Sequence, residues 1–126
     1  MTEIIISVGD EDFSARLTDD GSPETVRKIV EALPIESVAR TWGDEIYFDI
    51  PVEQAEENAQ ATVSKGALGY WPAGSCFCIF FGRTPMSSSE DEIVPASPVN
   101  VIGAVANPDG FKAHGPGETV SIRLAE

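Results

Sequence analysis

The chain has 126 residues, of which 42% are hydrophobic, and this length and composition predict a single domain, residues 1–126, with its own core. Eight basic against 21 acidic residues give a net charge of −13, which disfavours nucleic acid and anionic membranes as partners. No apolar run approaches the ~18 residues that a membrane-spanning helix requires, so we expect no membrane insertion.

The chain begins with an acidic segment that passes directly into three isoleucines at residues 4–6, which is unlike a secretory signal, so we predict a cytoplasmic protein. The acidic, lysine-poor composition fits either an ordinary soluble protein or one adapted to a high-salt cytoplasm. Cys76, Cys78 and the single His114 are too few ligands for a structural zinc site. We therefore expect neither a metal nor a cofactor.

The first third of the chain predicts a β-hairpin followed by a helix. Residues 4–8 are apolar except for Ser7 and residues 13–17 alternate, which favours two paired strands. Ser22 and Pro23 then form a typical helix start, with serine as the N-cap and proline at the first helical position. The helix presents one apolar face and ends before Pro34; the residues of that face are Val26, Ile29, Val30 and Leu33.

The middle of the chain predicts strands around a long apolar run. After a short strand at residues 37–40, residues 44–50 alternate strictly, with Glu45 and Tyr47 on the face opposite Ile46 and Phe48. Residues 53–60 form a loop or a short surface helix. Residues 67–71 and 76–81 then predict two strands around a turn at residues 72–74, the second buried on both faces.

Residues 86–98 have no apolar pattern, and we expect a long mobile loop that is either a functional lid or disordered. Two further strands are predicted at residues 99–105 and 119–124. About eight short strands with glycine-rich turns indicate a mainly β fold, a closed or nearly closed barrel with a helix capping one end.

Four runs of the sequence resemble the small cyclophilin-like proteins of bacteria and archaea, a largely uncharacterised group; they are residues 42–48, 70–74, 79–85 and 97–103. The resemblance covers nearly the whole chain. It implies an eight-stranded antiparallel cyclophilin-type β-barrel with helices at its ends, in agreement with the strand count.

The resemblance to the catalytic cyclophilins is weaker. Cys76 and Cys78 stand where those enzymes carry a glutamine and a phenylalanine that lines the proline pocket, and their arginine-bearing segment has no match here. Prolyl isomerisation is favoured by an arginine donor near the proline nitrogen, because its charged fork supplies preorganised hydrogen bonds. Arg40 and Arg83 flank the diagnostic strands, so isomerase activity stays an open alternative without an intact catalytic pattern.

A binding site is the preferred interpretation. One face of the central strands is expected to line an apolar groove with a few polar groups, which is typical of ligand sites. Glu45, beside aromatic residues, is either an exposed strand charge or the receptor of a cationic or hydrogen-bonding ligand. The expected ligand is a proline-containing peptide or a small molecule, and the predicted binding residues are Glu45, Tyr47, Tyr70, Phe77, Phe81 and Arg83.

Three alternatives stay open beside this interpretation. The helix could simply cover the same face, the protein could be a divergent prolyl isomerase, or it could be a non-enzymatic assembly component whose aromatic face buries a partner. The sequence does not indicate an oligomeric state.

Overall fold

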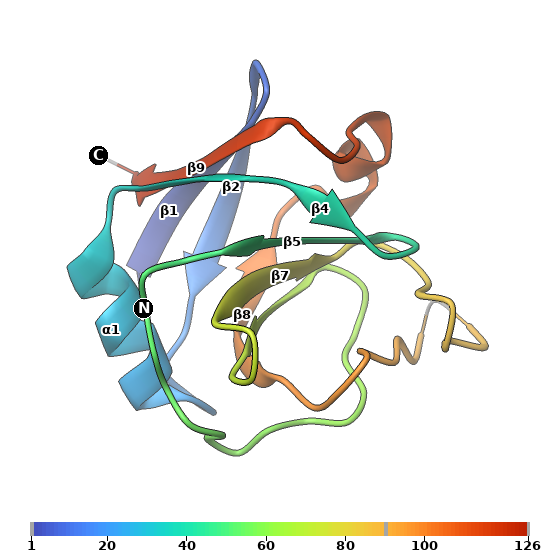
Figure 1. The fold of residues 1–126 in the computed structure, drawn as a ribbon, viewed down its shortest axis with the longest axis horizontal. Helices are drawn as coiled ribbons and strands as arrows, with labels where there is room; N and C mark the ends of the chain where they lie inside the picture. Colours follow the sequence, from blue (N-terminus) through green and yellow to red (C-terminus); the bar gives the residue numbers. More distant parts are fainter. Residues whose placement is uncertain (1, 90, 126) are drawn as a thin grey trace.

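Antiparallel strand pairing dominates the computed structural model, which describes residues 2–89 and 91–125 (Figure 1). Nine strands within these residues form one sheet that curves into a nearly closed barrel, as the sequence pattern predicts. The strands are β1 (Thr2–Val8), β2 (Glu11–Leu17), β3 (Ile35–Val38), β4 (Arg40–Thr41), β5 (Glu45–Asp49), β6 (Ala67–Trp71), β7 (Cys76–Phe80), β8 (Asn100–Val105) and β9 (Thr119–Leu124).

Residues 35–41 close the barrel. The strand order is β3-β9-β1-β2-β8-β6-β7-β5-β4, so the two ends of the sheet, β3 and β4, are neighbours along the chain. Between them lies the buried Ala39, whose backbone N–H donates to the Glu118 carbonyl oxygen at 2.9 Å. At this residue the strand pairing changes from β9 to β5. The single strand predicted at residues 37–40 is therefore two strands in the structure, β3 and β4.

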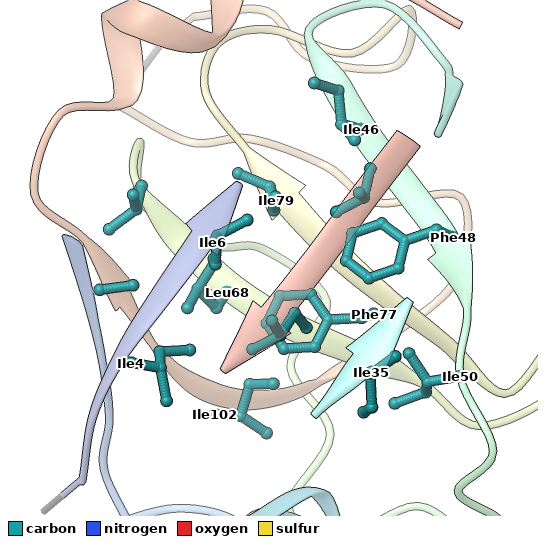
Figure 2. Close-up of a cluster of buried hydrophobic side chains, with 14 of the residues drawn as sticks. Ile4, Ile6, Ile35, Ile46, Phe48, Ile50, Leu68, Phe77, Ile79 and Ile102 are labelled. Atoms are coloured by element: carbon teal, nitrogen blue, oxygen red, sulfur yellow. The ribbon is translucent and has the colours of Figure 1, made fainter. Parts of the chain in front are cut away.

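The barrel interior is filled by alternate residues of the strands (Figure 2). On β1, Ile4, Ile6 and Val8 are fully buried, as expected for one face of a strand that packs on the core. Phe48 and Phe77 stack across the β5–β7 pair with ring centroids 5.2 Å apart. The interior is thus a packed hydrophobic core and not a channel.

The two helical segments lie on opposite sides of the barrel in the view of Figure 1; they are α1 (Pro23–Ala32) and the 3₁₀ helix η1 (Pro108–Ala113). Helix α1 buries Val26 and Ile29 against the core, as its apolar periodicity predicts. From η1, Phe111 stacks on Phe13 with centroids 3.8 Å apart. No helix in the described part of the chain is long and apolar enough to cross a membrane.

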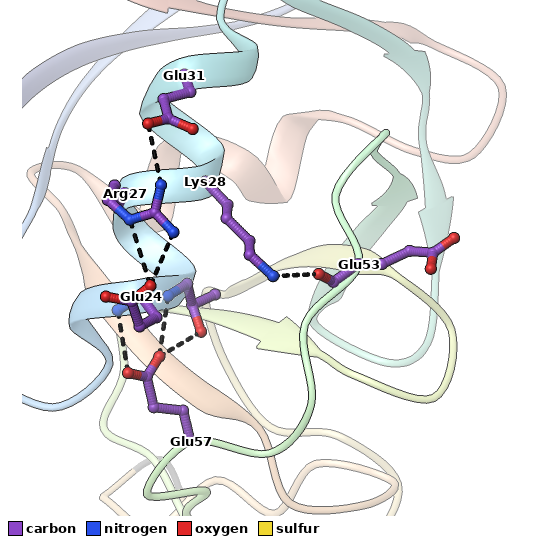
Figure 3. A network of polar contacts seen from close by, with 7 residues as sticks. Glu24, Arg27, Lys28, Glu31, Glu53 and Glu57 are labelled. Atoms are coloured by element: carbon purple, nitrogen blue, oxygen red, sulfur yellow. Dashed lines mark hydrogen bonds and ion pairs between the residues drawn. The ribbon is translucent and has the colours of Figure 1, made fainter.

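The N-terminus of α1 is capped by a residue that is distant in the sequence. Ser22 occupies the N-cap position as predicted, but its hydroxyl donates to the Glu57 carbonyl oxygen and makes no capping bond. The Glu57 carboxylate instead accepts the backbone N–H groups of Glu24 and Thr25 at 3.0 and 2.9 Å (Figure 3). A carboxylate offers two acceptors and a negative charge to the positive end of the helix dipole, so it replaces the serine side chain.

Buried Asn100 on β8 holds the Glu57 loop in place. Its side-chain oxygen accepts the Glu57 backbone N–H at 2.8 Å. Its amide group donates to the Thr25 hydroxyl and to the Ala55 carbonyl oxygen, both at 3.1 Å. The polar side chain is thereby satisfied inside the protein and ties the loop, the helix and the barrel together.

We expect Glu57→Ala to lower the free energy of unfolding by about 1–3 kcal/mol, because the variant loses the helix cap and the acceptor to which the Thr25 hydroxyl donates. Urea unfolding measures the change. The matched control is Glu56→Ala, which removes an exposed carboxylate from the neighbouring residue of the same loop. Equal stability changes in the two variants would contradict the capping role.

Candidate functional site

The two faces of β7 belong to different hydrophobic clusters. Phe77 and Ile79 point into the barrel core. Cys76, Cys78 and Phe80 point outward and form a second cluster, together with Val63, Ala67, Ile93 and Val99. The apolar run is therefore buried on both faces as predicted, on one side by the barrel core and on the other by residues from before and after β7 in the chain.

A pocket of about 160 Å³ lies on this outer side, between β5, β7 and residues 95–99. Three aromatic side chains, one carboxyl and one thiol contribute to its wall. The lining residues are Trp42, Glu45, Tyr47, Trp71, Cys78, Pro95, Ala96, Ser97 and Val99.

A tight turn between β4 and β5 brings Trp42 and Glu45 together. Their backbones exchange two hydrogen bonds, Trp42 N–H to Glu45 oxygen at 3.0 Å and Glu45 N–H to Trp42 oxygen at 3.2 Å. Gly43 has a φ of +62°, and a Cβ there would lie 3.0 Å from the Arg83 carbonyl oxygen. Only glycine suits this left-handed and crowded position, which explains the Trp-Gly-Asp-Glu sequence.

Residues 95–99 form the opposite wall, and backbone pairing anchors this segment at two points. Ile93 exchanges backbone hydrogen bonds with Val63 at 2.8 and 2.9 Å, and Val99 does so with Gln60 at 2.8 and 3.1 Å. The Thr84 hydroxyl also donates to the Val94 carbonyl oxygen at 2.6 Å. These contacts place residues 95–97 over the pocket.

Glu45 is the unusual residue of the pocket, a carboxyl whose residue is only 7% exposed. Burial raises its pKa to about 7, and a hydrogen bond from the Cys78 thiol opposes this shift in part. A group with this pKa can hold or release a proton near neutral pH. Buried, strongly shifted carboxyls in pockets are common features of functional sites.

The two thiols are not activated. Burial raises the pKa of Cys78, and the neighbouring Glu45 carboxyl raises it further. Burial and the Asp49 carboxylate raise the pKa of Cys76 to about 11. Both side chains therefore stay protonated at neutral pH and are poor nucleophiles.

Trp71 contributes a second unusual group. Its indole Nε1 is buried and has no hydrogen-bond partner among the described residues. A buried N–H without an acceptor costs about 1–3 kcal/mol, so such groups are uncommon in folded proteins. Trp71, a residue of the pocket wall, thus carries a buried and unpaired donor.

The structure brings two of the six sequence-predicted binding residues, Glu45 and Tyr47, to this pocket. Tyr70 is fully buried and donates its hydroxyl to the Val52 carbonyl oxygen at 2.6 Å. Phe77 and Phe81 belong to the barrel core. Arg83 is exposed and reaches the Ser88 carbonyl oxygen at 3.4 Å.

The pocket also contains residues that the sequence interpretation did not propose, above all Trp42, Trp71 and Cys78. Strand alternation sets Cys78 on the face of β7 opposite Phe77 and Ile79, but both faces are apolar, so the sequence does not show which one lines a pocket. No group of three or more His, Cys, Asp or Glu residues within residues 2–89 and 91–125 is arranged to hold a metal ion.

Comparisons with known proteins agree on the fold. The cyclophilin-like family model matches residues 2–123. The solution structure of the hypothetical protein AF2241 from Archaeoglobus fulgidus is 43% identical, with a TM-score of 0.82, over 98% of this chain and 95% of that one.

A second solved structure shares the fold at low identity. McbB in complex with tryptophan is 14% identical with a TM-score of 0.76, over 96% of this chain and 44% of that one. No functionally curated protein matches the chain. The family match over almost the whole length, the archaeal relative and the barrel topology lead to one conclusion: the chain belongs to the cyclophilin-like family.

Proposed function

We propose that this protein binds a small ligand in the pocket between β5, β7 and residues 95–99. The observation that carries the proposal is the buried carboxyl of Glu45, placed in a concave wall of aromatic side chains. A buried carboxyl that ionises near neutral pH opposes folding, so a role in binding explains its presence better than a role in stability.

The size and composition of the pocket support a small molecule, or a single side chain of a peptide, as the occupant. Ligand sites are typically concave and mostly apolar, with a few polar groups that orient the ligand. Here the polar groups are the Glu45 carboxyl and the Ser97 side chain, within a largely aromatic and aliphatic wall.

The positions of the arginines support ligand binding over prolyl isomerisation. That reaction needs a donor beside the proline ring, yet neither Arg40 nor Arg83 lines the pocket. Arg40 pairs with the Asp49 carboxylate at 2.6 Å and lies over the Tyr47 ring. We therefore rank ligand binding first and isomerisation second.

A fragment screen by heteronuclear NMR tests the proposal. We expect hits that shift the amide resonances of residues 42–47, 71, 96, 97 and 99. Ser97→Trp should weaken these hits at least about tenfold by filling the pocket, whereas Ser88→Trp, the same change in an exposed loop position outside the pocket, should not. A screen without hits at the pocket, or hits that Ser97→Trp leaves unchanged, would overturn the proposal.

A further inference from the structure

The charges of the pocket wall indicate the class of the ligand. The wall contains the Glu45 carboxyl and the Tyr47 phenol from β5 and the Cys78 thiol from β7. Trp42, Trp71 and the residues of the 95–99 segment in the wall carry no charge, and no lysine or arginine lines the pocket. The wall thus offers one negative charge and no positive one, in a chain whose net charge is −13.

The aromatic residues of the wall suit a cation as well. Trp42, Tyr47 and Trp71 line the same pocket, and the faces of such rings attract organic cations. The structure contains one such cation–π contact, in which the Arg40 guanidinium lies 4.7 Å from the centroid of the Tyr47 ring. A carboxylate among aromatic rings combines the two attractions that an ammonium group prefers.

The unpaired indole N–H of Trp71 adds a second requirement. An acceptor atom on the ligand would satisfy this donor and recover part of its desolvation cost. Since the nitrogen is buried, the indole must rotate for this contact to form. A ligand with an ammonium group and a nearby hydroxyl or other oxygen acceptor meets both requirements.

We propose, on the basis of the binding function above, that the pocket takes a free, small organic cation that also carries an oxygen acceptor. The ammonium group lies against the Glu45 carboxylate and the aromatic rings, and the oxygen accepts the Trp71 N–H. Charge complementarity to Glu45 and the unpaired indole donor carry this assignment.

Binding of such a cation is linked to a proton. Burial raises the pKa of Glu45 to about 7, and the cation favours the ionised carboxyl, so a proton is released on binding. The Cys78 thiol in the wall stays protonated in this range, because burial raises its pKa. Affinity should therefore rise about tenfold from about pH 6 to about pH 8, following the ionised fraction of Glu45.

Titration calorimetry with four probes tests the ligand class. Choline carries the cation and the hydroxyl, tetramethylammonium only the cation, and the uncharged alcohol dimethylbutanol replaces the quaternary nitrogen of choline by carbon. Phosphocholine represents a lipid headgroup. We expect choline to bind tightest and dimethylbutanol at least about tenfold more weakly. The phosphate of phosphocholine should weaken binding in this acidic protein.

Two variants test which residues determine the affinity for choline. Glu45→Gln should lower choline affinity about tenfold at about pH 8 and remove its pH dependence, whereas Glu36→Gln, an exposed carboxyl on β3, should change neither. Trp71→Phe keeps an aromatic ring but loses the donor, so it should bring choline and tetramethylammonium to equal affinity.

The outcomes separate this inference from the function on which it rests. Three results would overturn the proposal that the ligand is a free organic cation. They are equal affinity for choline and dimethylbutanol, a higher affinity for phosphocholine than for choline, and unchanged choline affinity in Glu45→Gln. Hits at the pocket in the fragment screen that are all neutral or anionic would overturn the cation class and leave the binding function standing. A screen with no hits of any charge would overturn both.

Discussion

Replacing Glu45 by glutamine should raise the free energy of unfolding by about 2–3 kcal/mol at about pH 8 and change it little at about pH 4. The folded-state pKa of Glu45 is raised by burial from 4.5 to about 7. Between these values the folded protein keeps a proton that the unfolded chain has released. The stability of the native protein therefore falls as the pH rises through this window, and the loss is complete above pH ~7.

Urea unfolding of the native protein and the variant across this pH range measures the effect. Glutamine keeps the size of the side chain but cannot ionise, so the difference between the two proteins should grow with pH. Glu36→Gln on the exposed face of β3 is the control and should show no comparable growth. If Glu45→Gln destabilised the protein equally at every pH, the carboxyl would be a structural group and the argument for a binding role would fail.

This prediction also bears on function. A group that weakens the fold at neutral pH is retained more readily where it contacts a ligand, since sites of activity are often suboptimal for stability. The proposed organic cation would pair with the carboxylate and offset its desolvation. A ligand of this class should therefore stabilise the native protein more than the Glu45→Gln variant at about pH 8.

Replacing Gly103 by alanine should lower the free energy of unfolding by more than about 3 kcal/mol. Gly103 lies on β8 between β2 and β6, where it is paired with Leu17 and Leu68. An added Cβ would lie 2.0 Å from the Arg16 carbonyl oxygen and 3.0 Å from the Leu17 Cα. Both atoms are backbone, so the clash can be relieved only if β2 separates from β8.

Thermal and urea unfolding of this variant should be compared with those of Gly115→Ala. No atom lies within 4 Å of a Cβ at Gly115, so that substitution should be neutral or stabilise the protein by up to about 1 kcal/mol. Similar stability of the two variants would show that the β2–β8 contact is looser than the structure has it. The result would also test why a glycine ends the Val-Ile-Gly run of the family resemblance.

The local elements and the fold class could be predicted from the sequence. Alternation placed the strand around Ile46 and Phe48, and the apolar run placed β7, because a side chain's direction along a strand follows a period of two. Proline at the first helical position and the apolar spacing of Val26 and Ile29 located α1. The resemblance to the cyclophilin-like family then implied the barrel, which the topology confirms.

The pocket could be predicted only in part. Alternation puts Glu45 and Tyr47 on one face of β5, and their proximity to aromatic residues suggested a ligand site. The same reasoning could not decide which face of β7 looks inward, because both faces are apolar. Phe77 lies in the core while Cys78 lines the pocket, and only the closure of the barrel determines this choice.

The sequence by itself thus determined the strands, the helix and the membership of a β-barrel family, since these follow from local periodicity and motif. Only the tertiary structure decided that Glu57 caps a helix that begins more than thirty residues earlier, as the 33-residue separation of the Glu24–Glu57 hydrogen bond shows. It also decided that residues 95–99 cover Glu45 and Trp71. The physical reason is that burial, a shifted pKa and an unpaired donor arise from contacts between distant segments, and no local pattern encodes them.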